Sequence, residues 1–162
     1  MKFVIDTSVI IAFCTECKRP ELLYYLKEKN NELYMPNAVS DEIKETDITY
    51  KLLYDLKTKK IIKNINTLDK NDILEFKNKH PYLNNGEIEV ILWGIKLKNK
   101  GVRYCCVIDD GKARKIAQLY KIKFTGTLGL LNKMVDLEIL SSEEKNKIIN
   151  KLKDAGFRIK LP

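Results

Sequence analysis

The amino-acid sequence lacks any apolar run long enough to cross a membrane, since none approaches the roughly 18 residues that a spanning helix needs. It also lacks the uninterrupted apolar segment of a secretory signal, because Asp6 directly follows the apolar residues Phe3, Val4 and Ile5. We therefore expect a cytoplasmic protein with no membrane partner.

Histidine and cysteine are both scarce. The single histidine, His80, lies in a polar stretch and is interpreted as a loop residue, so no Ser-His-Asp or Cys-His scheme can be built around it. Cys14 and Cys17 have the C-x-x-C spacing of half a zinc site or of a redox pair. Cys105 and Cys106 are adjacent, and neighbours in a strand point to opposite faces. We interpret all four as small buried hydrophobic residues in a reducing compartment, with the zinc half-site or redox pair as the alternative.

The composition is that of a folded protein with an excess of positive charge. Hydrophobic residues make up 44% of the 162 positions, which suffices for one domain over residues 1–162 without disulfides. The formal charge is +8, from 30 Lys and Arg against 22 Asp and Glu. Such an excess favours a polyanionic partner such as nucleic acid, although it is also typical of some source genomes and growth temperatures.

Apolar runs and periodic segments alternate along the chain, with no linker, repeat or low-complexity stretch. Strands are expected over residues 2–6, 33–35, 61–65, 104–108 and 122–124, with an edge strand over 157–161. Helices are expected over residues 9–13, 20–29, 36–45, 49–58, 68–79, 84–98, 111–120, 127–135 and 141–156. Thr7 or Ser8 can cap the first helix, and Ser141 with Glu144 forms a capping box for the last. This alternation predicts an α/β fold with helices on both faces of a mostly parallel sheet.

Three acids follow predicted buried strands. Asp6 ends the first strand, and Asp109 and Asp110 end the apolar strand at residues 104–108. Ligands of open α/β sheets bind at the carboxyl ends of the strands, so these carboxylates converge if the two strands are neighbours. Close carboxylates raise each other's pKa unless a cation neutralises them, and oxygen ligands without histidine suit Mg²⁺ or Mn²⁺.

Three further acids lie on predicted helices. Glu42 lies just beside the apolar stripe of its helix, and Glu87 and Glu89 lie in the first turn of the strongly apolar helix at residues 84–98. Each acid also has a structural interpretation. Asp6, and one of the pair Asp109 and Asp110, can cap helices, Glu42 can be a solvated charge, and Glu87 and Glu89 can favour a helix N-terminus.

Taken in order, these acids and their surroundings resemble those of PIN domains. The resemblance rests on six segments, at residues 3–10, 36–43, 83–91, 107–114, 125–131 and 155–159. The Gly-Glu-x-Glu and Asp-Asp motifs within them are similar to those of a prokaryotic PIN-like branch. The resemblance implies a three-layer α/β/α domain with about five strands. It also implies a Mg²⁺- or Mn²⁺-dependent ribonuclease, often the toxin of a toxin–antitoxin pair and commonly a homodimer.

The resemblance also assigns residues. Asp6, Glu42 and Glu87 match the first three acids of the family, and Asp110 best matches the last, which gives four expected catalytic and metal-binding residues. Asp109 and Glu89 are additional expected metal ligands, although the role of Glu89 is open. Ile108 stands where the family usually has a Thr or Ser before the last acid.

Basic residues must accompany such acids, because a cluster of negative charge repels the phosphate backbone. Lys112, Arg114 and Lys115 begin beside Asp110 and are the expected RNA contacts. A second basic group, at residues 96–103, is equally well interpreted as solvated surface. The missing hydroxyl at Ile108 favours the alternative of a PIN-like module that binds RNA or protein without cutting. A DNA-directed flap endonuclease is disfavoured, because the chain lacks room for the helical arch of those enzymes.

Overall fold

The computed structural model of the protein describes residues 1–44, 48–66 and 68–157. Its centre is a five-stranded, all-parallel sheet with the order β3-β2-β1-β4-β5. The strands are β1 (Lys2–Ile5), β2 (Glu32–Pro36), β3 (Ile62–Ile65), β4 (Tyr104–Val107) and β5 (Phe124–Thr125). β1 lies between β2 and β4, so the strand order changes direction at β1 and β4, as the convergence of the strand-end acids requires.

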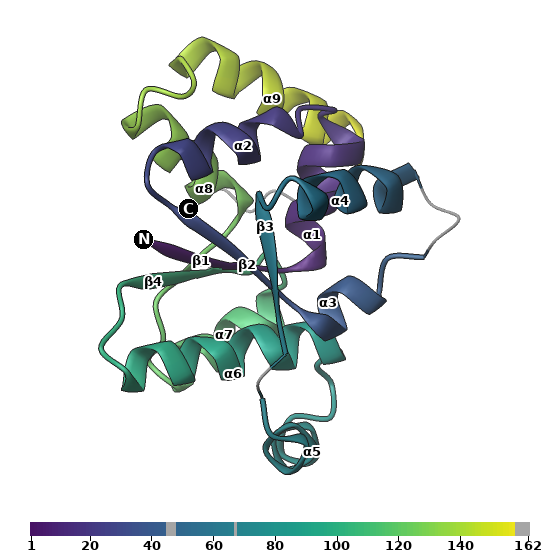
Figure 1. Cartoon of the computed structure of the whole chain (residues 1–162), viewed down its shortest axis with the longest axis vertical. Helices are drawn as coiled ribbons and strands as arrows, with labels where there is room; N and C mark the ends of the chain where they lie inside the picture. The colour runs from purple at the N-terminus through teal and green to yellow at the C-terminus, as the bar shows by residue number, and fades with distance from the viewer. Residues whose placement is uncertain (45–47, 67, 158–162) are drawn as a thin grey trace.

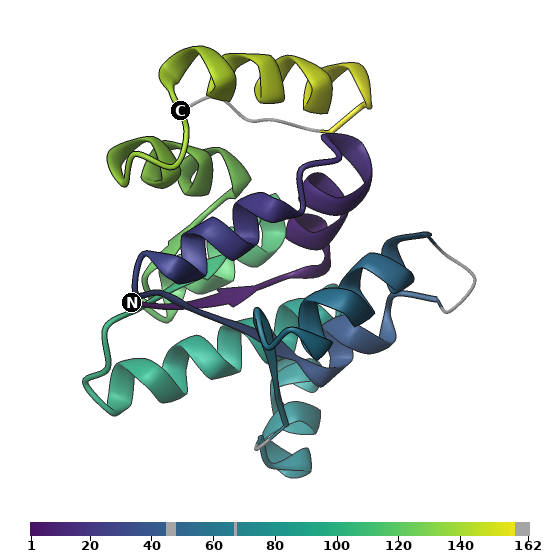
Figure 2. The ribbon, with the colours of Figure 1, turned by 45° about the horizontal axis from the view of Figure 1, so that its top comes forward.

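Helices cover both faces of the sheet, which confirms the three-layer α/β/α architecture (Figure 1). The helical elements are α1 (Thr7–Ile10), η1 (Ile11–Glu16), α2 (Glu21–Glu28), α3 (Asn37–Asp41), α4 (Ile48–Thr58), α5 (Lys70–Lys79), α6 (Asn85–Asn99), α7 (Gly111–Leu119), α8 (Thr127–Asp136) and α9 (Ser142–Asp154). Figure 2 shows α6 running along one face while α2 lies across the other. α5 packs outside α6, at the opposite end of the molecule from α9.

The helix α6 is buried on two sides, as its apolar residues predict. Ile88 and Ile91 are buried, and so are Val90 and Leu97 on the other side of the helix. Gly94 brings α6 close to the sheet, because a Cβ atom there would lie 2.7 Å from the Cys106 Sγ atom. The burial of apolar side chains around α6 is therefore a main contribution to the stability of the fold.

The chain after β1 differs from the prediction in its details. Asp6, rather than Thr7 or Ser8, occupies the N-cap position of α1, and its side chain makes no capping hydrogen bond. The helix then widens into the π-helix η1, in which the Cys17 N–H donates to the Ala12 carbonyl five residues earlier. π-helical segments are rare and often lie near functional sites.

Two further boundaries differ from those expected. The helix predicted over residues 36–45 ends at Asp41, so Glu42 occupies its C-cap position, and residue 45 lies outside the described residues. The edge strand predicted over residues 157–161 also lies almost entirely outside them. The capping box of Ser141 and Glu144 at the start of α9 is confirmed.

Three of the four cysteines and the histidine are buried. All four cysteines are free thiols, and Cys105 is the least buried of them, which agrees with their interpretation as small hydrophobic residues. His80 lies outside the helix, at the C-cap position of α5, which agrees with its interpretation as a loop residue; its side chain is buried against Phe76 and Tyr120. Within the described ranges, no helix is both long and apolar enough to span a membrane.

Candidate functional site

The carboxyl ends of β1 and β4 bring two acids from distant parts of the chain together. Ile5 pairs with Val107 in the parallel register, and Asp6 and Asp109 follow these strand ends closely. The Ser8 hydroxyl lies 3.3 Å from Oδ2 of Asp6 and 3.3 Å from Oδ2 of Asp109. Because a hydroxyl has one proton to donate, the two carboxylates share it.

Asp6 is the most buried acid of this site, with 7% of its surface exposed. The pKa of Asp6 is raised from 3.8 to about 7, chiefly by burial; the backbone N–H of Thr7 opposes this rise, and the negative charges of Glu42 and Glu87 contribute to it. Over residues 1–44, 48–66 and 68–157, no group donates a hydrogen bond to Oδ1 of Asp6. A buried carboxylate oxygen without a donor is costly unless a proton or a cation neutralises it.

Glu42 is held at the end of α3 by contacts from two other elements. The Thr7 hydroxyl donates to Oε2 at 2.5 Å, and the Gly86 backbone N–H donates to Oε1 at 3.0 Å. Gly86 also leaves the space for this carboxylate, because a Cβ atom at Gly86 would lie 2.7 Å from Oε1. The carboxylate of Glu42 is thus fixed between α1 and α6, although the side chain is otherwise exposed.

Glu87 is buried at the start of α6 and forms a capping box with Asn84. The Asn84 N–H donates to Oε2 of Glu87 at 2.9 Å, and the Glu87 N–H donates to the Asn84 side chain at 2.7 Å. Burial raises the pKa of Glu87. The hydrogen bond from the Asn84 N–H lowers this pKa, and the negative charges of Asp110 and Glu42 raise it. These mutual effects connect Asp6, Glu42, Glu87 and Asp110 electrostatically.

The two acids after β4 have different structural partners. Asp110 caps α7, since its Oδ1 accepts from the N–H groups of Lys112 at 2.7 Å and Ala113 at 2.9 Å. Asp109 accepts from the Thr127 N–H at 2.9 Å and from the Thr127 hydroxyl at 2.6 Å. The position of Thr127 at the start of α8, two residues after the end of β5, is the sequence signal that could have drawn attention to it.

A comparison with protein families agrees with this arrangement, since a PIN-domain model matches residues 2–161. The chain belongs to the PIN-domain family. No curated protein matches the chain. PIN domains are usually nucleases and typically use divalent metal ions. The strand-end acids lie at the edge of the sheet where open α/β folds generally bind ligands.

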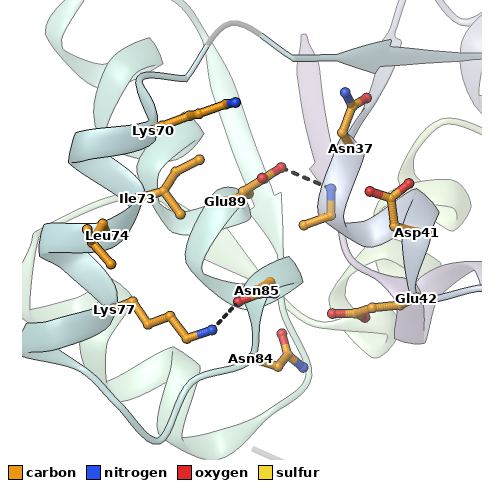
Figure 3. Close-up of a pocket in the computed structure, with 11 residues that line it drawn as sticks. Asn37, Asp41, Glu42, Lys70, Ile73, Leu74, Lys77, Asn84, Asn85 and Glu89 are labelled. Atoms are coloured by element: carbon orange, nitrogen blue, oxygen red, sulfur yellow. Dashed lines mark hydrogen bonds between the residues drawn. The ribbon is translucent and has the colours of Figure 1, made fainter.

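The remaining expected site residues of this PIN domain lie on α6 and α7. Oε2 of Glu89 accepts a hydrogen bond from the Ala38 N–H at 3.1 Å, so Glu89 joins α6 to the start of α3 and lines a pocket beside the acids (Figure 3). Arg114 donates from Nε to the Ile108 carbonyl at 2.7 Å, and its guanidinium lies 3.6 Å from Asp109. Lys112 and Lys115 are exposed on α7.

The acids of this PIN domain fit a hard divalent cation in their chemistry. Carboxylate oxygens are the ligands that Mg²⁺ prefers, and Mg²⁺ commonly binds proteins through one or two carboxylates while it keeps several waters. In the part of the chain that the structure describes, no group of three or more His, Cys, Asp or Glu side chains is arranged to hold a metal ion. Oδ1 of Asp6 lacks a hydrogen-bond donor among the described residues, and the charges of Glu42 and Glu87 repel the ionised form of Asp6. A cation bound at this oxygen would neutralise both effects.

Proposed function

We propose that the protein is a Mg²⁺- or Mn²⁺-dependent endoribonuclease that hydrolyses phosphodiester bonds of RNA. The observation that carries the proposal is the state of the Asp6 carboxylate. It is buried, its Oδ1 lacks a hydrogen-bond donor among the described residues, and the negative charges of two other acids, Glu42 and Glu87, raise its pKa. Such a group is unfavourable at neutral pH unless a cation neutralises it. Membership of a family whose proteins are usually nucleases supports the same conclusion.

The proposed ligands are Asp6, Glu42, Glu87 and Asp110. These residues would hold a divalent ion, which would supply a water of lowered pKa and offset the negative charge on the phosphodiester oxygens. Attack of that water on phosphorus, with departure of the 3′-oxygen, would leave a 3′-hydroxyl and a 5′-phosphate. The protein contributes orientation: Thr7 and Gly86 fix the Glu42 carboxylate, and the capping box of Asn84 fixes Glu87.

Asp109 has a supporting role in this proposal. Thr127 donates two hydrogen bonds to it, and Arg114 lies beside it, so its charge is already compensated by the protein. Ser8 links Asp109 to Asp6 and orients the Oδ2 oxygen of Asp6. In this proposal Asp109 therefore acts mainly by positioning Asp6, and the cation is held by the four proposed ligands.

The decisive experiment is the cleavage of an end-labelled, mixed-sequence, single-stranded RNA with Mn²⁺, with Mg²⁺ and with EDTA. Wild type, Asp6→Asn and the control Asp154→Asn, an exposed acid at the end of α9, would be purified identically. We expect metal-dependent products from wild type and the control, and a loss of at least about a hundredfold for Asp6→Asn. Equal products from all three proteins would reveal a contaminating nuclease and contradict the proposal.

A second function is favoured by one specific observation. Within residues 1–44, 48–66 and 68–157 the acids do not gather into a three-ligand group, and Asp109 and Asp110 both accept hydrogen bonds from the protein. A PIN-like module that binds RNA or protein without cutting needs no tighter arrangement. The Asp6→Asn variant distinguishes the two functions. If the protein is a nuclease, this variant loses the cleavage that the wild type shows. If it is a binding module, neither protein cleaves, and the variant keeps or gains RNA affinity because a negative charge is removed.

The resemblance to PIN-domain toxins supports a finer proposal about partners. We propose that the protein acts in the cytoplasm as the toxin of a toxin–antitoxin pair and as a homodimer. Induced expression should then arrest growth in wild type and not in Asp6→Asn, and light scattering should give about twice the chain mass of 18.9 kDa. Normal growth with wild type would contradict the toxin role, and a monomeric mass would contradict the homodimer.

A further inference from the structure

A pocket of about 750 Å³ lies directly beside the acid site, between α3, α5 and the start of α6 (Figure 3). The helix α5 forms one wall, and the opposite wall is formed by α3 together with the first turn of α6. Glu42 lines this pocket and also belongs to the acid site, where Thr7 and Gly86 hold its carboxylate. The pocket and the acids are therefore continuous through a single side chain.

The α5 wall combines an apolar surface with two cations. Lys70, Ile73, Leu74 and Lys77 are spaced so that they share one face of the helix, and all four line the pocket. Leu74 is 59% exposed, which is unusual for a large apolar side chain on a concave surface. This exposed leucine between two lysines matches a nucleotide of a nucleic-acid strand. The flat base would cover the leucine, and the phosphates on either side would lie near the two ammonium groups.

The opposite wall carries hydrogen-bond acceptors. Asp41 directs its carboxylate into the pocket beside Asn37, and Glu89 uses only Oε2 for the Ala38 N–H (Figure 3). Ionised carboxylates accept hydrogen bonds and cannot donate them. They therefore favour a base with an amino group, such as cytosine or adenine, over uracil, whose edge presents two carbonyl oxygens around one N–H.

We propose that this pocket binds one nucleotide of a single-stranded RNA next to the bond presented to the acid site, and that it prefers an amino-bearing base to uracil. In this arrangement Lys70 and Lys77 contact the flanking phosphates, Leu74 packs against the base, and Asp41 accepts from the amino group. The inference rests on the proposed ribonuclease function for its substrate class. It adds the side chains that position the strand and read the base.

The test measures binding without cleavage, by fluorescence anisotropy of labelled oligocytidylate, oligoadenylate and oligouridylate in EDTA. The pocket variant is Lys70→Ala/Lys77→Ala, and the matched control is Lys151→Ala/Lys153→Ala, which removes two exposed lysines from α9. We expect the pocket variant to bind roughly tenfold more weakly than the control. We also expect its log–log salt slope to fall by about 1.4, since each phosphate contact to a single strand contributes about 0.7.

The base preference is tested with Asp41→Asn, an exposed position whose change leaves the core untouched. Wild type should bind oligocytidylate and oligoadenylate several-fold more tightly than oligouridylate, and Asp41→Asn should reduce that ratio even if all three affinities rise. Equal affinities of the pocket and control variants, or wild type that binds no RNA, would overturn the assignment of the pocket. An unchanged ratio in Asp41→Asn would overturn the base preference.

These outcomes are independent of catalysis. If the wild type does not cleave RNA and the pocket variant binds RNA more weakly than the control, the ribonuclease function is contradicted and the assignment of the pocket stands. A wild type that cleaves, with a pocket variant that binds as the control does, contradicts only the pocket.

Discussion

Thr127, at the start of α8, donates its hydroxyl to Oδ2 of Asp109 across 2.6 Å, and its backbone N–H donates to Oδ1 of the same side chain. The sequence of this PIN domain has Ile108 where the family usually has a hydroxyl residue before the last acid. Thr127 therefore supplies a hydroxyl to the acid site from a different element. The hydroxyl that the motif lacks at Ile108 is thus provided by a residue that lies 18 positions after Asp109 in the chain.

Replacing Thr127 tests this pairing. Thr127→Val keeps the shape of the side chain and removes the hydroxyl, so the partly buried Asp109 carboxylate loses a donor. We expect a decrease of about 1–3 kcal/mol in the free energy of unfolding, measured by urea denaturation. Thr127→Ser is the matched control, because it retains the hydroxyl, and it should lie closer to wild type. A valine variant as stable as wild type would show that the bond contributes little.

Substitution of Gly86 should change RNA cleavage without lowering the stability of the fold. A Cβ atom at Gly86 would lie 2.7 Å from Oε1 of Glu42, so Gly86→Ala displaces this carboxylate, which is the mobile end of a side chain. Alanine is the better helix former by up to about 1 kcal/mol, so thermal stability should be unchanged or slightly higher. RNA cleavage should nevertheless fall at least about tenfold, because Glu42 moves relative to Asp6. Gly101→Ala, which meets no atom within 4 Å but has a positive φ of 65°, should show the reverse pattern.

Asp6 predicts an unusual dependence of stability on pH in metal-free protein. Its pKa is about 7 in the folded state against the ordinary value of 3.8 expected in the unfolded chain, so between these values the folded state binds a proton that the unfolded state has released. Stability should therefore decrease as the pH rises from about 4 and level off above about 7, by a total on the order of 4 kcal/mol. Asp6→Asn lacks this titration and should be the more stable protein at pH 8 in EDTA.

Urea unfolding in EDTA at several pH values measures this difference directly. Addition of Mn²⁺ at pH 8 should stabilise wild type more than Asp6→Asn, because ligand that binds only the folded state raises its stability. Parallel pH curves for the two proteins would contradict the assignment of a raised pKa to Asp6.

Local signals predict most of the fold and the order of the site acids. The alternation of apolar strands with periodic helices is enough to predict the parallel sheet, the burial of α6 and the neighbouring positions of the acids after β1 and β4. The capping box of Ser141 and Glu144 is equally local, because a cap and its partner lie three residues apart; the box of Asn84 and Glu87 has the same spacing and was not predicted.

The remaining details depend on contacts between distant parts of the chain. α3 ends at Asp41, and Glu42 then receives a hydrogen bond from Gly86, 44 residues away, which no pattern within the helix contains. The same holds for the pairing of Asp109 with Thr127. The π-helix after α1 is also hidden, because its sequence is compatible with an ordinary α-helix.

The three basic residues after Asp110 should separate into two kinds when they are substituted. Arg114 donates to the Ile108 carbonyl and lies beside Asp109, so Arg114→Lys should lower stability by about 1–2 kcal/mol through the loss of this geometry. Lys112 and Lys115 are exposed, so Lys112→Ala/Lys115→Ala should leave stability within about 0.5 kcal/mol of wild type.

RNA binding should show the opposite ranking. In EDTA the Lys112→Ala/Lys115→Ala variant should bind single-stranded RNA several-fold more weakly, with a smaller salt slope, because two phosphate contacts are removed. Combined with Lys70→Ala/Lys77→Ala the losses should add, since the two pairs lie on different helices, α7 and α5. A double variant on α7 that binds RNA as tightly as Lys151→Ala/Lys153→Ala would show that the strand approaches the acids from the α5 side alone.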